Sequence, residues 1–190
     1  RVPLGLKQGE TLIGSRTTDT ESYQNHLRAK ALFRARAINE AINVWEPVVA
    51  RDPGYAPAWS LLATAYALAP TYAPGVRNSP TPEARNVVQS YLEKAEAAAR
   101  KAIQLDSRNA NAYASLAYTQ YLRLKWADAE DLYRQALMLD PNDPDVLNGY
   151  SVFLGAGDHT KDALRIREQL RALEPFVPTY SIFTADAMQR

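Results

Sequence analysis

Small and apolar residues recur along this chain in a fixed register, and short phrases rich in Pro and Asp separate the recurrences. The phrase that contains Pro53 returns at Ser107, Pro141 and Pro175, after steps of 54, 34 and 34 residues. Twelve residues before each of these positions stands an alanine, in the order Ala41, Ala95, Ala129 and Ala163. Two antiparallel helices approach closely only where side chains are small, so the pattern predicts a series of packed helical hairpins.

A second set of positions supports the same register. Seven and eight residues into each repeat stand the pairs Arg28-Ala29, Leu62-Ala63, Leu116-Ala117 and Tyr150-Ser151, whose second member is always small. The sequence therefore predicts an all-α superhelix of about four helix pairs over residues 21–175.

The second repeat is longer than the others, because a step of 54 exceeds 34 by 20 residues. Its Pro-rich part predicts a loop insertion at 70–81. Thr81 and Pro82 are typical of an N-cap and a first-turn proline, and the apolar spacing continues that helix to about residue 105. In the second helix of the first repeat, Pro47 predicts a kink or an early end.

The two ends of the chain depart from the register. We interpret residues 1–20 as a linker or the tail of a preceding domain, and a chain that opens at Arg1 without an initiator Met as part of a longer protein. Residues 176–190 look like the start of a further helical repeat. Because a solenoid usually ends in a polar helix, we expect apolar Leu173 and Phe176 to meet more protein, a second copy included.

These residues resemble the tetratricopeptide repeat (TPR), a helix–turn–helix unit of 34 residues. The third repeat matches its pattern best, at Tyr113, Leu116, Ala117, Ala129, Tyr133, Ala136 and Pro141. The resemblance implies a TPR solenoid with a C-terminal partial repeat, and a protein or peptide partner in its concave groove.

A narrower resemblance rests on residues 22–32. They look like the first repeat of bacterial regulators in which an adenylate/guanylate cyclase domain or a winged-helix domain precedes a TolB- or FlgO-like region. This implies an interaction module of a bacterial signalling protein. The alternatives are the TPR part of a winged-helix transcriptional regulator and a general assembly scaffold. Such a module would be cytoplasmic, with the periplasm as the alternative.

Composition excludes several function classes. The chain has 190 residues, no Cys and a net charge of +1, so it lacks a thiolate nucleophile and an electrostatic drive toward nucleic acid or an anionic membrane. No apolar run approaches the roughly 20 residues of a membrane span. The basic group of Arg28, Lys30, Arg34 and Arg36 is interpreted as a solvated helix face.

The sequence predicts no catalytic, metal or cofactor residue, and any cyclase domain would lie outside this chain. The two histidines, His26 and His159, lie in different repeats, and neither has a second His or a Cys at helical spacing. The acidic run 140–145 fits an inter-repeat turn with Asp143 as N-cap better than a calcium loop. Gly157 is typical of a helix C-cap rather than of a phosphate loop.

The TPR resemblance carries over groove-lining positions to a candidate partner-binding set: His26, Lys30, Phe33, Asn111, Tyr118, Tyr121 and Asn148. We expect the aromatic side chains to anchor a partner, and the amides and the lysine to orient its backbone. The alternative is that the aromatic residues pack between repeats. The carboxylate clamp for chaperone tails is rejected, because only Lys30 and Asn148 remotely match it.

Overall fold

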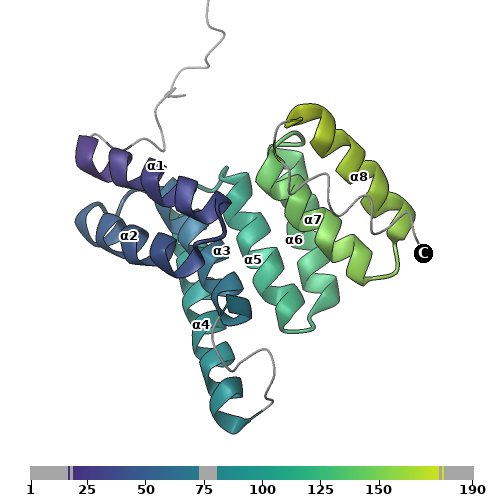
Figure 1. Ribbon diagram of the computed structural model, residues 1–190. Coiled ribbons are helices and arrows are strands. Elements are labelled where there is room, and N and C mark those ends of the chain that lie inside the picture. The colour runs from purple at the N-terminus through teal and green to yellow at the C-terminus, as the bar shows by residue number, and fades with distance from the viewer. Residues whose placement is uncertain (1–16, 18, 73–80, 176, 178–190) are drawn as a thin grey trace, which may run out of the picture.

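The computed structural model describes residues 17, 19–72, 81–175 and 177, and within them it contains helices and no strand. The helices are α1 (Thr20–Arg34), α2 (Ile38–Arg51), α3 (Ala56–Tyr72), α4 (Pro82–Leu105), α5 (Ala110–Leu122), α6 (Trp126–Leu139), α7 (Pro144–Ala156) and α8 (Thr160–Leu173). Consecutive helices pack as four hairpins, and α3, α5 and α7 also pack on one another in that order (Figure 1). The expected partial repeat at 176–190 and most of the segment 1–20 lie outside the described residues.

The small-residue positions form the interior of this stack. Ala41, Ala95 and Ala129 are fully buried, and Ala163 is 5% exposed. The second set, Ala29, Ala63, Ala117 and Ser151, is buried completely. Helix pairs therefore meet where the sequence places short side chains, which confirms the predicted register.

Three of the turns within hairpins share one unusual backbone conformation. Their central residues have φ near +60°, at Arg36 (65°), Leu124 (61°) and Asp158 (62°). In the third repeat, the N–H of Lys125 donates to the carbonyl of Gln120 at 3.0 Å, and the N–H of Leu124 donates to that of Tyr121 at 2.9 Å. This is the Schellman pattern, in which glycine usually takes the left-handed position. In the fourth repeat Gly157 is the C-cap, as predicted, and the next residue adopts positive φ.

The insertion begins later than the sequence predicts. Helix α3 continues to Tyr72, so Pro70 lies inside the helix and is buried rather than opening a loop. Burial of the proline ring and a hydrogen bond from the Thr71 hydroxyl to the carbonyl of Leu68 (2.7 Å) extend the last turn. Residues 73–80 lie outside the described part of the chain. Thr81 then caps α4 by accepting from the N–H of Ala84, as predicted.

Pro47 does not end its helix. Helix α2 runs on to Arg51 with the proline ring on its exposed side, so the expectation of an early end is wrong. The buried face of α2, with Trp45 and Val48, packs against the core on both sides of the proline. We attribute the continuity of the helix to this packing, which outweighs the lost backbone hydrogen bond.

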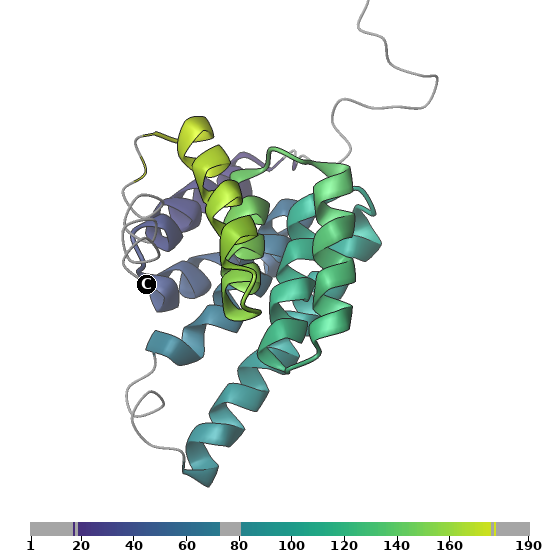
Figure 2. The same ribbon diagram turned by 90° about the vertical axis from the view of Figure 1, so that its right-hand side faces the viewer.

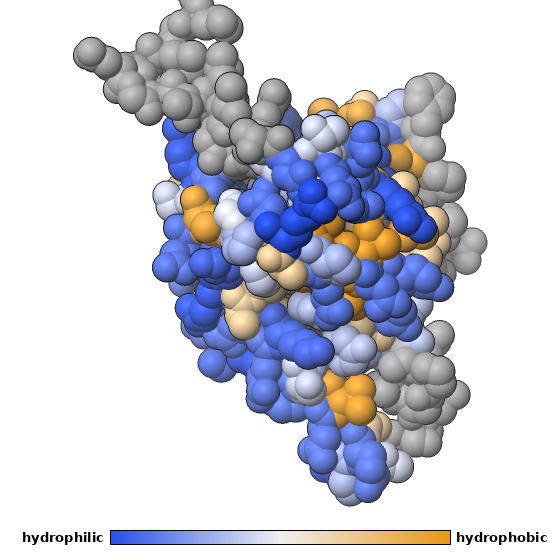
Figure 3. All heavy atoms as spheres, turned by 90° about the vertical axis from the view of Figure 1, so that its left-hand side faces the viewer, coloured by the Kyte–Doolittle hydropathy of each residue, from blue (hydrophilic) through white to orange (hydrophobic). Residues whose placement is uncertain are grey.

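The long helix α4 extends beyond the ends of its neighbours (Figure 2). Seen from the side of α1 and α2, the surface is largely hydrophilic with separate apolar patches (Figure 3). No helix in the described residues is long and apolar enough to cross a membrane.

Candidate binding pocket

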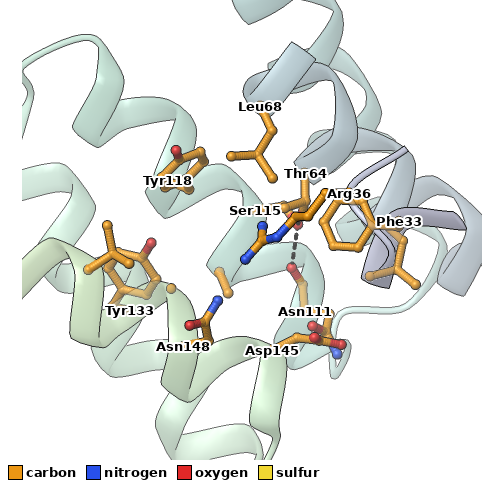
Figure 4. A pocket seen from close by; sticks show the side chains of 14 residues that line it. Phe33, Arg36, Thr64, Leu68, Asn111, Ser115, Tyr118, Tyr133, Asp145 and Asn148 are labelled. Carbon is orange, nitrogen blue, oxygen red and sulfur yellow. Dashed lines mark hydrogen bonds between the residues drawn. The ribbon is translucent and has the colours of Figure 1, made fainter. Parts of the chain in front are cut away.

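The first helices of the four hairpins surround a pocket of about 220 Å³ (Figure 4). Its lining comes from every repeat: Phe33, Arg36, Leu61, Thr64, Leu68, Asn111, Ala114, Ser115, Tyr118, Tyr133, Asp145, Asn148, Gly149 and Val152. Helical spacing brings these residues together, because positions i, i+3, i+4 and i+7 share one face. On α7 that face carries Asp145, Asn148, Gly149 and Val152.

Polar contacts hold the walls of the pocket to one another. The hydroxyls of Thr64 on α3 and Ser115 on α5 lie 2.6 Å apart, and that of Ser115 also donates to the carbonyl of Ser60 at 2.9 Å. The amide of Asn111 donates to the carboxylate of Asp143, the N-cap of α7, at 2.6 Å. Thr64, Ser115 and Asn111, which take part in these contacts, thus also line the pocket.

Two charged side chains of opposite sign line the pocket, Arg36 and Asp145. Burial raises the pKa of the Asp145 carboxyl, and the nearby charge of Asp143 adds to the effect. Lys30 and Arg34 on α1 act in the opposite direction without reversing it.

A buried tyrosine from a second helix forms part of the pocket wall. Tyr133 on α6 is fully buried, and its hydroxyl has no hydrogen-bond partner among the described residues. Burial raises the pKa of this hydroxyl well above its usual value, so it stays protonated. A Cβ at Gly149 would lie 3.1 Å from the Tyr133 oxygen, so the glycine gives that hydroxyl its room.

The chain is similar in structure, though not in sequence, to known proteins. In sequence, no family model and no curated protein matches the chain. TTC0263, a thermophilic TPR protein of Thermus thermophilus, aligns with a TM-score of 0.69 and 19% identity over 90% of this chain and 83% of that chain. The Arabidopsis OM64 TPR domain aligns with a TM-score of 0.52 and 16% identity over 72% of this chain and 96% of that chain. This chain has the TPR fold.

In a TPR superhelix the first helices line the concave side, so the pocket lies in the groove. Four of the candidate residues line it, namely Phe33, Asn111, Tyr118 and Asn148. Lys30 does not line it, although its charge acts on Asp145. Phe33 and Tyr118 are partly exposed, as a contact with a partner requires.

His26 lies in the interior of the first TPR hairpin rather than in the groove, which corrects its predicted placement. It is 6% exposed, and its Nδ1 accepts a hydrogen bond from the indole N–H of Trp45 at 3.2 Å. Its ring meets that of Tyr55 edge-on, with centroids 5.0 Å apart. Burial, with a smaller effect of Lys30, lowers the pKa of His26 to about 4. The histidine is thus a neutral acceptor that satisfies a buried indole.

Tyr121 lies outside the pocket, in an aromatic cluster between the third and fourth TPR units. Its ring lies 5.2 Å from that of Trp126 and 6.0 Å from that of Phe153, both edge-on. For this residue the alternative of packing between repeats describes the structure better than a groove contact.

Two pocket residues were not among the sequence candidates. Arg36 lies in the turn after α1, where the TPR pattern assigns no groove position. Tyr133 belongs to a second helix, where a large side chain predicts internal packing only. The pairing of small Gly149 with large Tyr133 is the signal in the sequence that could have indicated this part of the pocket wall.

The described residues offer no group of three or more His, Cys, Asp or Glu side chains arranged to hold a metal ion.

Proposed function

We propose that this chain is a non-catalytic protein–protein interaction module that binds a peptide segment of its partner in the concave pocket. The observation that carries the proposal is the combination of apolar walls with the buried hydroxyl of Tyr133, which has no hydrogen-bond partner among the described residues. A buried hydroxyl without a partner costs free energy, and a ligand that bonds to it recovers that cost.

Phe33 and Tyr118 are the expected anchors. Both come from first helices and present aromatic surface to the groove, from the first and third repeats respectively. Large aromatic side chains in partly enclosed pockets supply most of the binding energy in such contacts. Asn148 on α7 also lines the pocket, and we expect its amide to bond the backbone of the bound segment.

The neighbouring tyrosines Tyr118 and Tyr121 provide the test. They have the same side chain, and the centroids of their rings lie 5.9 Å apart, but of the two only Tyr118 lines the pocket. The purified chain is used to select peptides from a displayed random dodecamer library, and the affinities of the selected peptides are measured by fluorescence anisotropy.

We expect Tyr118→Ala to weaken the selected peptides by about tenfold or more, as for a binding hot spot. Tyr121→Ala should instead lower the melting temperature and leave the affinity near that of the parent chain. If Tyr118→Ala lowers the melting temperature and leaves affinity intact, the aromatic residues only pack between repeats and the proposal fails.

The resemblance at residues 22–32 supports a further step, that the module is the sensing or assembly arm of a bacterial cyclase-type signalling protein. A winged-helix regulator and a general scaffold are the alternatives. The sequence of the complete gene decides among them, through cyclase metal-binding carboxylates upstream, a winged-helix pattern, or neither. Light scattering on the chain tests self-association through its C-terminal end.

A further inference from the structure

The pocket is bounded by the first and the last of the described repeats. Phe33 and Arg36 come from α1 and the turn after it, whereas Asp145 and Asn148 come from α7. Helix packing joins α1 to α2 and α3, and it joins α7 to α5, α6 and α8. The first and the fourth repeat therefore face each other across the pocket.

The two repeats carry charges of opposite sign toward each other. In the first repeat, Lys30 and Arg34 belong to α1, and Arg36 belongs to the turn that follows. In the fourth repeat, Asp145 lies in the first turn of α7. Lys30 and Arg34 both favour the ionised form of the Asp145 carboxyl, so their charges act from one repeat on the other. These two cations of α1 are therefore more than the solvated helix face that the sequence suggests.

The charge of Asp145 is compensated only in part. Burial disfavours its ionised form most, and the carboxylates of Asp143 and Glu174 add to this effect. Lys30 and Arg34 oppose it through charge alone, without a hydrogen bond to the Asp145 carboxyl. Because the attraction between opposite charges grows as they approach, a closer approach of α1 to α7 would stabilise the carboxylate further. The electrostatic force on the two repeats thus pulls them together.

The fold allows such a force to change the width of the pocket. Each repeat of a solenoid contacts only its neighbours, so small rotations at successive junctions add up along the stack. The distance between the first and the fourth repeat collects the rotations of every junction between them. This distance is therefore the one that a weak attraction between the repeats changes most.

We propose that Lys30 and Arg34 of α1 and Asp145 of α7 form an electrostatic clasp that draws the first and the fourth repeat together and sets the width of the pocket. Arg36, whose guanidinium points into the pocket in Figure 4, adds to the positive side. As a control on peptide entry the clasp rests on the function proposed above, but the attraction itself is a property of the free chain. Salt weakens the clasp, because dissolved ions screen charges at a partly exposed site.

Pulsed electron paramagnetic resonance tests the clasp by measuring the distance between two spin labels on the free chain. The chain has no Cys, so Gln24→Cys on α1 and Ala172→Cys on α8 provide two unique labelling sites, both exposed. Charges act over roughly 30 Å at about 10 mM salt and over roughly 3 Å at about 1 M salt. We expect the mean distance between the labels to increase by a few ångströms from the lower to the higher salt concentration.

Charge variants of the labelled chain identify the groups responsible. Lys30→Gln with Arg34→Gln should give the long distance already at low salt. The matched control, Arg28→Gln with Arg85→Gln, removes two exposed cations that are not among the charges acting on Asp145, and it should keep the short distance. Reversal of all three charges, by Lys30→Glu, Arg34→Glu and Asp145→Lys, should restore the short distance at low salt. Misfolding cannot produce that restoration.

Peptides selected from the displayed library then test the effect on entry. Neither Lys30 nor Arg34 lines the pocket, so their neutralisation acts on a peptide through the clasp. In stopped-flow fluorescence the association rate constant should rise by about twofold or more, because binding no longer waits for the repeats to separate. The control pair of substitutions should leave it unchanged.

The outcomes separate the clasp from the proposed function. The clasp is overturned if the label distance is the same at both salt concentrations, or if the control pair lengthens it as much as the Lys30 and Arg34 pair does. Peptide binding stands in either case. An unchanged association rate in the neutralised chain would refute the control on entry. If no library peptide binds the parent chain, the proposed function fails, and the label distances still decide whether the clasp exists.

Discussion

The turn between α5 and α6 offers a direct test of how the hairpins are closed. Leu124 occupies the left-handed position with φ 61°, and its side chain is 74% exposed. A residue with a Cβ is strained there, whereas glycine is not. Replacing Leu124 by Gly therefore removes strain at the cost of few contacts.

The magnitude follows from these two observations. About a quarter of the Leu124 surface is buried, so truncation to either Ala or Gly loses roughly 0.5 kcal/mol of apolar burial. The left-handed conformation costs an L-residue about 1–2 kcal/mol, which glycine does not pay. Glycine has more conformational freedom in the unfolded chain, and this reduces the gain in stability by about 0.5–1 kcal/mol. We expect Leu124→Gly to be about 0.5–1 kcal/mol more stable than Leu124→Ala.

Urea denaturation followed by circular dichroism measures this difference as a shift in midpoint at unchanged slope. The control is the same pair of substitutions at Arg28, an exposed position inside α1, where glycine should be about 1 kcal/mol less stable than alanine. Equal midpoints for the two Leu124 variants would refute the idea that the positive φ stores strain.

Three further predictions concern the interior and one helix cap. Because the pKa of His26 falls from 6.5 to about 4 on folding, the unfolded chain takes up the proton first as the pH falls. The contribution of His26 to stability is therefore complete above pH 6.5, and about 3 kcal/mol of it is lost by pH 4. In urea denaturation measured at a series of pH values, His26→Gln should flatten this dependence of stability on pH. Tyr133→Phe should stabilise the chain by about 1 kcal/mol, seen as a higher melting temperature, because it removes a buried hydroxyl without a partner among the described residues. The same substitution should weaken peptide binding. Thr81→Ala should cost about 1 kcal/mol, seen as a lower urea midpoint, because the side-chain bond to the N–H of Ala84 is lost.

The repeat register was readable from the sequence because it depends on side-chain size. At Ala41 or Ala129 a larger residue would separate two helices, so close packing requires small residues at the same position of each repeat. The helix caps at Thr81 and Asp143 were readable for a similar reason, since both depend on neighbours two or three residues away.

The errors concern effects that local sequence does not contain. Pro47 and Pro70 are helix breakers in isolation, yet packing keeps both inside helices. His26 stands at a groove position in the TPR pattern, but in the structure it is buried and accepts a hydrogen bond from the indole of Trp45, 19 residues further along the chain. Arg36 joins the pocket through the geometry of a turn, which no periodicity describes.

The hydrogen bonds that join the repeats give the pocket a mechanical property. The Thr64–Ser115 pair ties the second repeat to the third, and the Asn111–Asp143 bond ties the third to the fourth. A change in the pitch of the superhelix has to stretch these bonds, and three of the side chains that make them, Thr64, Ser115 and Asn111, line the pocket. Force or torque applied to either end of the solenoid is thus transmitted to the walls of the groove, and an occupant that fits between them stiffens the whole arm.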